Sequence, residues 1–236
     1  MHKSESEILE VLNGLGSKKL DLDTLFSFYS LNLSFEVRKI IAEKIGMQER
    51  KGYFLLKKMI KNFGLRVEFI EALKLTNDKE AKDLLLKNLY QKNNLNIHII
   101  KALEPWGGEI ELNLISEIFD ICETEFWIAG LNILHFKAHQ LTDEKLLSLI
   151  NQIKIYDNLK INFKIISILK RRESEIVCKL LYKYSLNKEL EIAKYAIFSL
   201  GSIWNDNSFE QLSKLENEIT NPSLLKCIKN QKLISN

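Results

Sequence analysis

We expect this 236-residue chain to be all-α, a right-handed α-solenoid of about seven helix pairs. The first observation is a recurring segment that closes on an aliphatic residue every 30 residues or so, a period typical of stacked helical repeats. These closing residues are Ile45, Leu73, Leu103, Leu134, Leu169 and Leu200. The second is composition: 2 prolines and 9 glycines are few, as a mostly helical chain requires. The third is that no alternation of apolar and polar residues is sustained, which argues against a sheet.

Each repeat is expected to hold two helices. In the first helix, apolar residues recur at positions i, i+4, i+5 and i+8, which places them on one stripe that must pack against a neighbour. Val37, Ile41, Ala42 and Ile45 show the pattern. The second helices follow short polar breaks. We expect them at residues 50–62, 79–89, 109–122, 143–153, 174–184 and 209–219.

Helix start and stop signals bracket these segments. Ser4-x-x-Glu7 and Ser208-x-x-Gln211 have the capping-box pattern, and Asn221 stands as a capping residue before Pro222. Glycines follow the last apolar position of three helices, where a left-handed residue is least strained as glycine. These glycines are Gly46, Gly64 and Gly201.

The chain is expected to form a single repeat domain over residues 1–236. Residues 1–33 read as N-terminal capping helices (4–15 and 20–31), 34–220 as the repeats, and 221–236 as a closing helix. A solenoid of this length is one array, because each unit contacts only its neighbours. The start of the chain lacks the apolar run of a signal peptide, and no apolar stretch reaches the length of a membrane span. We therefore expect a cytoplasmic protein.

The three cysteines are far apart and show no paired spacing. Cys122, Cys178 and Cys227 each fall on the apolar phase of a helix. We expect them to be small buried hydrophobic residues in a reducing compartment, with no metal or nucleophilic role.

A family resemblance can be named from the first helix of the repeat. The segment Val37-Arg-Lys-Ile-Ile-Ala-Glu-Lys-Ile-Gly46 resembles the first helix of the short HEAT-type repeat found in phycobilisome lyases and their relatives. The segment Ala196-Ile-Phe-Ser-Leu-Gly201 is similar to the same pattern. The resemblance covers roughly residues 34–220 and concerns apolar spacing. It implies a HEAT-like αα superhelix in which this helix lines the concave face.

If that resemblance holds, two columns of side chains project toward the concave groove. They read Ile40, Glu68, His98, Ala129, Lys164 and Tyr195, and Glu43, Glu71, Lys101, Asn132, Ser167 and Phe198. From these columns, with Trp127 added, we predict a partner-binding surface. Its residues are Glu68, Glu71, His98, Lys101, Trp127, Asn132, Lys164, Tyr195 and Phe198. The alternative is that they are ordinary solvated positions.

Aromatic residues suggest an anchor within that surface. Trp127, Tyr195 and Phe198 are the expected cluster, because exposed aromatics are favoured anchors at interfaces. Trp106 and Trp204 lie beside turns and are candidate anchors for the same reason. The alternative for all three tryptophans is that large rings fill gaps between irregular repeats.

No motif indicates catalysis. A Gly-rich phosphate loop, a Gly-x-Ser-x-Gly elbow and paired metal-binding cysteines are all missing from the sequence. His135 and His139 have the spacing of a metal pair, but no third ligand follows at a recognisable distance. We therefore predict no catalytic residue, no metal site and no cofactor.

Basic residues gather at 50–66 and 160–172 in a chain whose net charge is only +3. Such clusters either contact phosphates or form solvated helix faces, and interspersed glutamates favour the second interpretation. Nucleic acid is therefore a less favoured partner than protein, and no membrane contact is expected.

The predicted function is a non-catalytic scaffold or adaptor that holds a protein partner on the concave face. The first alternative, implied by the resemblance, is a bilin lyase or a chaperone-like subunit acting on phycobiliproteins. The second is a DNA-binding protein similar to helical-repeat alkylation-repair glycosylases. An enzyme is thus left open but not favoured, and the sequence gives no oligomeric state.

Overall fold

The computed structural model of the protein describes residues 4–14, 21–89, 94–153 and 158–234. Within these ranges the chain is built of helices and contains no β-strand. The predicted all-α class is thereby confirmed. The chain divides into two compact units, residues 1–106 and 107–236, where the sequence suggested one continuous domain.

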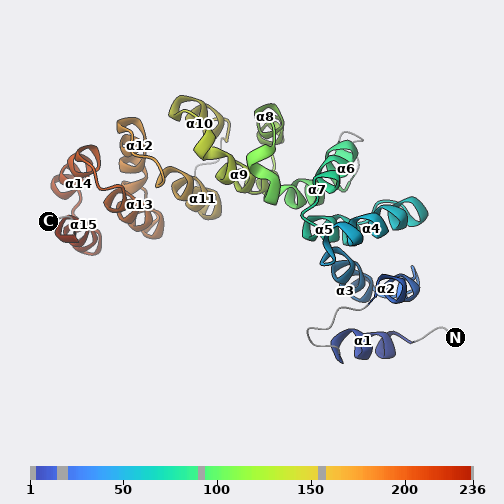
Figure 1. The fold of residues 1–236 in the computed structure, drawn as a ribbon. Coiled ribbons are helices and arrows are strands. Elements are labelled where there is room, and N and C mark those ends of the chain that lie inside the picture. Colours follow the sequence, from blue (N-terminus) through green and yellow to red (C-terminus); the bar gives the residue numbers. More distant parts are fainter. Residues whose placement is uncertain (1–3, 15–20, 90–93, 154–157, 235–236) are drawn as a thin grey trace. The chain divides into compact units, whose positions relative to one another are not determined.

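The N-terminal unit stacks helices in two layers (Figure 1). Its helices are α1 (Glu5–Gly14), α2 (Leu22–Phe28), α3 (Phe35–Gly46), α4 (Glu49–Phe63), α5 (Val67–Leu75), α6 (Lys79–Leu89) and α7 (Asn96–Ala102). Helices α3, α5 and α7 pack side by side in one layer, which we call the first layer. Helices α4 and α6 belong to the second layer, where α4 packs on α3 and α5, and α6 packs on α5 and α7. A 3-10 turn, η1 (Glu104–Glu109), runs past the end of this unit.

The C-terminal unit repeats the arrangement. Its elements are α8 (Leu112–Asp120), α9 (Thr124–Lys137), η2 (Ala138–Gln140), α10 (Asp143–Ile150), α11 (Leu159–Leu169), α12 (Glu175–Ser185), α13 (Leu190–Ile203), α14 (Asp206–Glu218) and α15 (Pro222–Ile234). Helices α9, α11, α13 and α15 pack in sequence to form one layer. Helices α8, α12 and α14 each pack against this layer: α8 packs on α9, α12 packs on α13, and α14 packs on α13 and α15. The predicted second helices therefore exist, with ends that differ from the sequence estimate by a few residues.

An aliphatic seam holds each unit together, as the repeat predicted. All six closing aliphatic residues, from Ile45 to Leu200, have an exposed fraction of 0%. Burying a side chain of this size stabilises a fold by about 1.5–3 kcal/mol. The seam is therefore the main reason that these short helices are stable, since isolated helices of this length are marginal in water.

Two of the three predicted stop glycines have another role. Gly64 does end α4 in a positive-φ conformation (φ 79°). Gly46 is still helical, and a Cβ placed on it would lie 2.3 Å from the carbonyl oxygen of Ala72. Gly201 also lies inside its helix, where a Cβ would meet the side chain of Gln231. At Gly46 and Gly201 glycine therefore permits close helix packing rather than a left-handed turn.

The capping predictions are confirmed at two of three helix starts. Ser4 and Glu7 form the expected reciprocal bonds, and the Asn221 side chain accepts from the backbone of Ser223. At α14 the cap is Asn205, whose side chain accepts the N–H of Ser208 at 2.8 Å. The prediction of Ser208 as the capping residue is wrong, because the helix begins three residues earlier. Leu15 and Leu20, at the expected ends of the first two helices, lie outside the described residues.

The cysteine prediction holds only in part. Cys178 is buried, Cys227 is partly exposed and Cys122 is exposed. Cys122 follows the end of α8, so the helical phase that predicted its burial no longer applies there. As for membranes, no helix in the described ranges combines the length and apolarity that crossing a bilayer requires.

Candidate functional site

A groove opens on the first layer of the N-terminal unit, across three consecutive repeats. Helix α3 contributes Glu43 and helix α5 contributes Glu71, Lys74 and Leu75. Helix α7 contributes His98, Lys101 and Ala102. The volume of the groove is about 330 Å³, within the range of ligand sites in proteins. We call this site the α3–α5–α7 groove.

The repeat itself explains why the charged residues converge. Glu43, Glu71 and Lys101 each stand two residues before a closing aliphatic residue of the seam. Equivalent positions on stacked helices point the same way, so these three side chains form one row across the layer. Leu75 and Ala102, at the ends of α5 and α7, supply the apolar part of the lining.

Charge is divided between the two ends of the groove. At the α3 end, the Lys39 ammonium lies 2.7 Å from a Glu71 carboxylate oxygen and 4.0 Å from one of Glu43. The hydrogen bond to Glu71 raises the pKa of Lys39. One lysine is thus shared by two carboxylates, which leaves this end with a net negative charge.

The α7 end has the opposite character. Lys74 and Lys101 both line it, and the Lys74 ammonium lies 3.7 Å from a carboxylate oxygen of Glu104. His98, half-buried, stands on the same helix as Lys101. A ligand with a cationic and an anionic group therefore finds an opposite charge at each end of the groove.

Of the predicted partner-binding residues, Glu71, His98 and Lys101 come together in this groove. Sequence reasoning missed Lys74, Leu75 and the role of Lys39. Lys74 and Leu75 follow the closing residue Leu73, beyond the last position of either predicted column.

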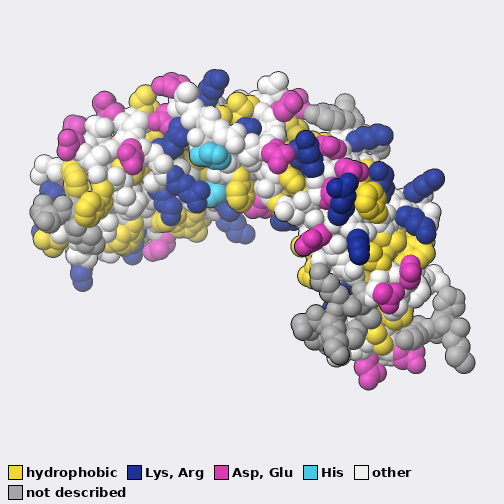
Figure 2. Space-filling model, viewed as in Figure 1, with side chains coloured by type: hydrophobic (Ala, Val, Ile, Leu, Met, Phe, Trp, Pro, Cys, Tyr) yellow, Lys and Arg dark blue, Asp and Glu magenta, His cyan; other side chains and the backbone are white. Residues whose placement is uncertain are grey.

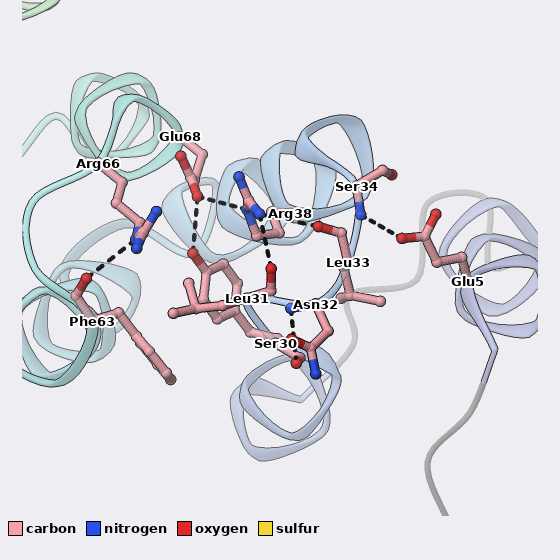
Figure 3. A network of polar contacts seen from close by, with 11 residues as sticks. Glu5, Ser30, Leu31, Asn32, Leu33, Ser34, Arg38, Phe63, Arg66 and Glu68 are labelled. Carbon is pink, nitrogen blue, oxygen red and sulfur yellow. Dashed lines mark hydrogen bonds and ion pairs between the residues drawn. The ribbon is translucent and has the colours of Figure 1, made fainter.

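Glu68 does not face the groove, so its prediction as a binding residue is wrong. Its exposed fraction is 2%. One carboxylate oxygen, Oε1, accepts hydrogen bonds from the Tyr29 hydroxyl and from Nε of Arg38, both at 2.9 Å (Figure 3). A side chain held by two partners in the core is not available to a ligand.

The Arg38 guanidinium extends this network to the start of the repeats. Its Nη1 donates to the carbonyl oxygens of Leu31 at 3.2 Å and Leu33 at 3.0 Å, in the segment between α2 and α3 (Figure 3). Burial and the hydrogen bond to Glu68 raise the pKa of Tyr29. The Tyr29–Glu68–Arg38 network thus ties the N-terminal helices to the first two repeats, and its role is structural.

Trp127 is also in the core, and its prediction as an anchor is wrong. Its exposed fraction is 3%, and the indole N–H donates to the carbonyl oxygen of Phe119 at 2.8 Å. The ring therefore packs α9 against α8. Trp106 is buried as well (5%), whereas Trp204 is 58% exposed.

The remaining predicted residues lie in the C-terminal unit, Asn132 on α9, Lys164 on α11, and Tyr195 and Phe198 on α13. Lys164 and Phe198 are exposed, and Asn132 is half-buried. The ring of Tyr195 packs edge-on against Phe163, with centroids 5.3 Å apart. The expected aromatic cluster of Trp127, Tyr195 and Phe198 therefore does not form, because Trp127 is in the core.

In the described part of the chain, no three histidine, cysteine or acidic side chains are grouped so as to hold a metal ion. The charged and titratable groups that line the groove are carboxylates, ammoniums and one imidazole. Its chemistry favours binding of charged groups.

Comparisons with known proteins assign no family to the chain. No family model matches the chain, and no curated protein matches it. Among solved structures, human deoxyhypusine hydroxylase in complex with glycerol is similar, with a TM-score of 0.40 and 13% sequence identity. The match covers 98% of this chain and 96% of that one. At this level the likeness concerns the path of the chain and not its site.

The comparison also corrects the functional prediction. The similar structure is that of an enzyme, a hydroxylase, and not of a scaffold. The inference from repeat architecture to a scaffold or adaptor was therefore wrong. Its two alternatives, a bilin lyase-like protein and a DNA glycosylase-like protein, rested on the same kind of resemblance and are dropped with it.

Proposed function

We propose that the protein recognises an extended polypeptide segment in the α3–α5–α7 groove, in a cytoplasmic setting. The proposal concerns what this one groove binds and gives the chain no scaffold role. The observation that carries it is the separation of charge, with carboxylates at the α3 end and ammoniums at the α7 end, in a groove that Leu75 and Ala102 also line. Polypeptides carry both charges and apolar groups at short intervals.

The spacing of the helices defines the segment. Packed helices lie about 8–10 Å apart, so the groove spans about 16–20 Å from α3 to α7. An extended chain advances by about 3.3 Å per residue, so about 5–6 residues cross it. We expect a basic residue near Glu43 and Glu71, and an acidic residue about four positions away near Lys74 and Lys101.

Rigidity supports the proposal. Glu43, Glu71 and Lys101 stand on helices whose neighbouring seam residues are fully buried, so the row of charges is in place before a ligand arrives. Preorganised groups lose less conformational entropy on binding.

The test uses fluorescein-labelled octapeptides with one lysine and one glutamate two to six positions apart in an alanine–leucine background. Binding is measured by fluorescence anisotropy against wild type, Glu71→Gln and Lys101→Gln. An exposed ion pair contributes up to about 1 kcal/mol, so each variant should bind the best peptide about fivefold more weakly. Glu117→Gln and Lys145→Gln, at exposed positions in the other unit, make the same charge changes and serve as controls.

The spacing series gives a second criterion. Affinity should peak at a separation of about four residues and fall on either side. Equal affinity at all spacings, or equal losses of affinity in the groove and control variants, would show that the groove does not recognise a polypeptide segment.

A further inference from the structure

The outer face of α4 carries a row of cations interrupted by one aromatic ring. Taking 100° per residue, the row falls within an arc of roughly 80°. Its members, all exposed, are Lys51, Phe54, Lys58 and Lys61. The opposite side of the helix is the core side, with Tyr53, Leu56 and Met59 at exposed fractions of 2% or less. We call the exposed row the α4 ridge.

Further cations flank the ridge on one side. Arg50 and Lys57 share Glu80 of α6, at 3.8 Å and 3.9 Å. The Arg50 guanidinium also lies 5.8 Å from the centroid of the Phe54 ring. Glu80 compensates only one of these two charges, so the flank adds to the positive potential of the ridge. Figure 2 shows the Lys and Arg side chains gathered over the α4 region.

Phe54 is exposed to 51%, although it stands among cations on a helix whose apolar side is already buried. The Lys58 ammonium lies over the ring of Phe26 on α2, 5.0 Å from its centroid. This contact orients the lysine side chain. A large ring that is half exposed among the lysines of the ridge, none of which has an ion-pair partner in the described ranges, is typical of an interface centre with a charged rim.

We propose that the α4 ridge is a docking surface for an acidic amphipathic helix of a partner protein. The spacing of the ridge carries this proposal. Residues 51, 54, 58 and 61 follow each other at intervals of three, four and three, the spacing of the contact seam between two packed helices. A partner helix with carboxylates at the same intervals, and one apolar side chain opposite Phe54, complements it in charge and in register.

The length of the ridge sets the length of the partner. From Lys51 to Lys61 the helix rises about 15 Å at 1.5 Å per residue. A partner helix of about two heptads covers this distance. The docking surface lies in the second layer, on other residues than the α3–α5–α7 groove, so it does not depend on the proposed function.

Two other polyanionic partners, single-stranded nucleic acid and an anionic membrane surface, fit this face less well. Single-stranded nucleic acid is usually held in a cationic groove with several rings for stacking, whereas the ridge is a convex helix face with one ring. A membrane-surface helix inserts its apolar face between lipids, and the apolar face of α4 is buried in the protein. An acidic helix needs neither a groove nor insertion.

The experiment uses a fluorescein-labelled, helix-forming 21-residue peptide with glutamates at the seam positions, one central leucine and alanine elsewhere. The wild-type chain should bind it at low salt and more weakly as salt rises. Lys51→Gln/Lys58→Gln/Lys61→Gln should lower the affinity about tenfold, because three exposed pairs are lost. Lys160→Gln/Lys226→Gln/Lys229→Gln, also exposed, removes the same charge and should change the affinity less than twofold.

Three further measurements decide between occupants. A peptide of the same composition with its glutamates spread around the helix should bind about tenfold more weakly. Phe54→Ala should weaken binding of the seam peptide but leave polyglutamate binding unchanged. Equal binding of the two peptides, equal losses in the two triple variants, or tighter binding of a 20-nucleotide single strand or of phosphatidylserine vesicles would overturn the proposal.

Discussion

The Tyr29–Glu68–Arg38 network makes a quantitative prediction about the stability of the N-terminal unit. Glu68→Leu removes the carboxylate that accepts from Tyr29 and Arg38, while keeping a side chain of similar size. The Arg38 guanidinium, 16% exposed, then lacks its counter-ion, and the Tyr29 hydroxyl loses its acceptor.

The expected loss follows from these contacts. Removing one member of a buried ion pair typically costs about 3–5 kcal/mol, because the other charge stays buried and unpaired. Arg38 keeps its bonds to the carbonyl oxygens of Leu31 and Leu33, which compensate it in part. We therefore expect a loss at the lower end, about 3 kcal/mol in the free energy of unfolding.

Urea unfolding followed by far-UV circular dichroism measures this loss. Tyr29→Phe alone should cost about 1 kcal/mol, the usual contribution of one hydrogen bond. The double variant should cost less than the sum of the single losses, because both changes remove the same bond. As a control, Glu210→Leu removes the partner of Lys214 in an exposed pair and should cost at most about 0.5 kcal/mol.

The network also gives the protein a pH dependence of known sign. The pKa of Tyr29 is raised above its ordinary value of 10.0, so the folded state resists losing this proton. The stabilisation is complete below pH 10 and is lost progressively as the pH rises above that value. Tyr29→Phe should therefore lose less stability than wild type between pH 10 and 11.5. A loss below 1 kcal/mol in Glu68→Leu, together with equal alkaline slopes, would refute the account of this network.

Three further predictions concern packing and reactivity. Trp127→Ala should lower the free energy of unfolding by about 3–5 kcal/mol, whereas Trp204→Ala, at a 58% exposed position, should change it little; thermal melts of both variants check this. Gly52→Ala should destabilise by about 1–3 kcal/mol, because its Cβ would lie 1.9 Å from the carbonyl oxygen of Ile45, and Gly14→Ala, with nothing within 4 Å, is its control in the same melts. Burial raises the pKa of Cys178 to about 11, so iodoacetamide at pH 8 should alkylate it only after unfolding, as followed by peptide mass spectrometry.

The helix pairs were predictable because their signal is repeated. Six similar segments give six independent indications of the same seam, and all six closing residues proved to be buried. Helix ends were less predictable. The capping-box pattern predicted a cap at Ser208, whereas Asn205 caps α14 and the helix begins at Asp206.

The groove was only partly predictable, because a groove depends on how neighbouring repeats pair their charges. Lys39 shows this: its position on α3 says nothing of the carboxylate of Glu71 on α5, 2.7 Å away. The ion pair between Lys74 and Glu104 likewise joins residues 30 positions apart. Such contacts fix the charge at each end of the groove, and no spacing within one helix reveals them.

Helical phase explains which predicted residues reached the groove and which did not. In each first helix, the core stripe is centred close to the closing aliphatic residue. At 100° per residue, positions two before that residue, such as Glu71 and Lys101, lie roughly 175° from the centre of the stripe and face away from the core. Positions five before it, Glu68 among them, lie at roughly 125°, on the flank that meets the adjacent repeat.

Trp127 stands seven positions before Leu134, only about 35° from the centre of the stripe, so its phase alone places it in the core. Arg38 has the same phase relative to Ile45, and its guanidinium is 16% exposed. A charged residue at this position needs a buried partner, which is the reason that Glu68, on the flank of the next helix, turns inward to meet it. The two incorrect site predictions therefore share one cause, the position seven residues before the closing residue. Trp127 occupies this position in its own helix, and Glu68 pairs with Arg38, which occupies it in α3.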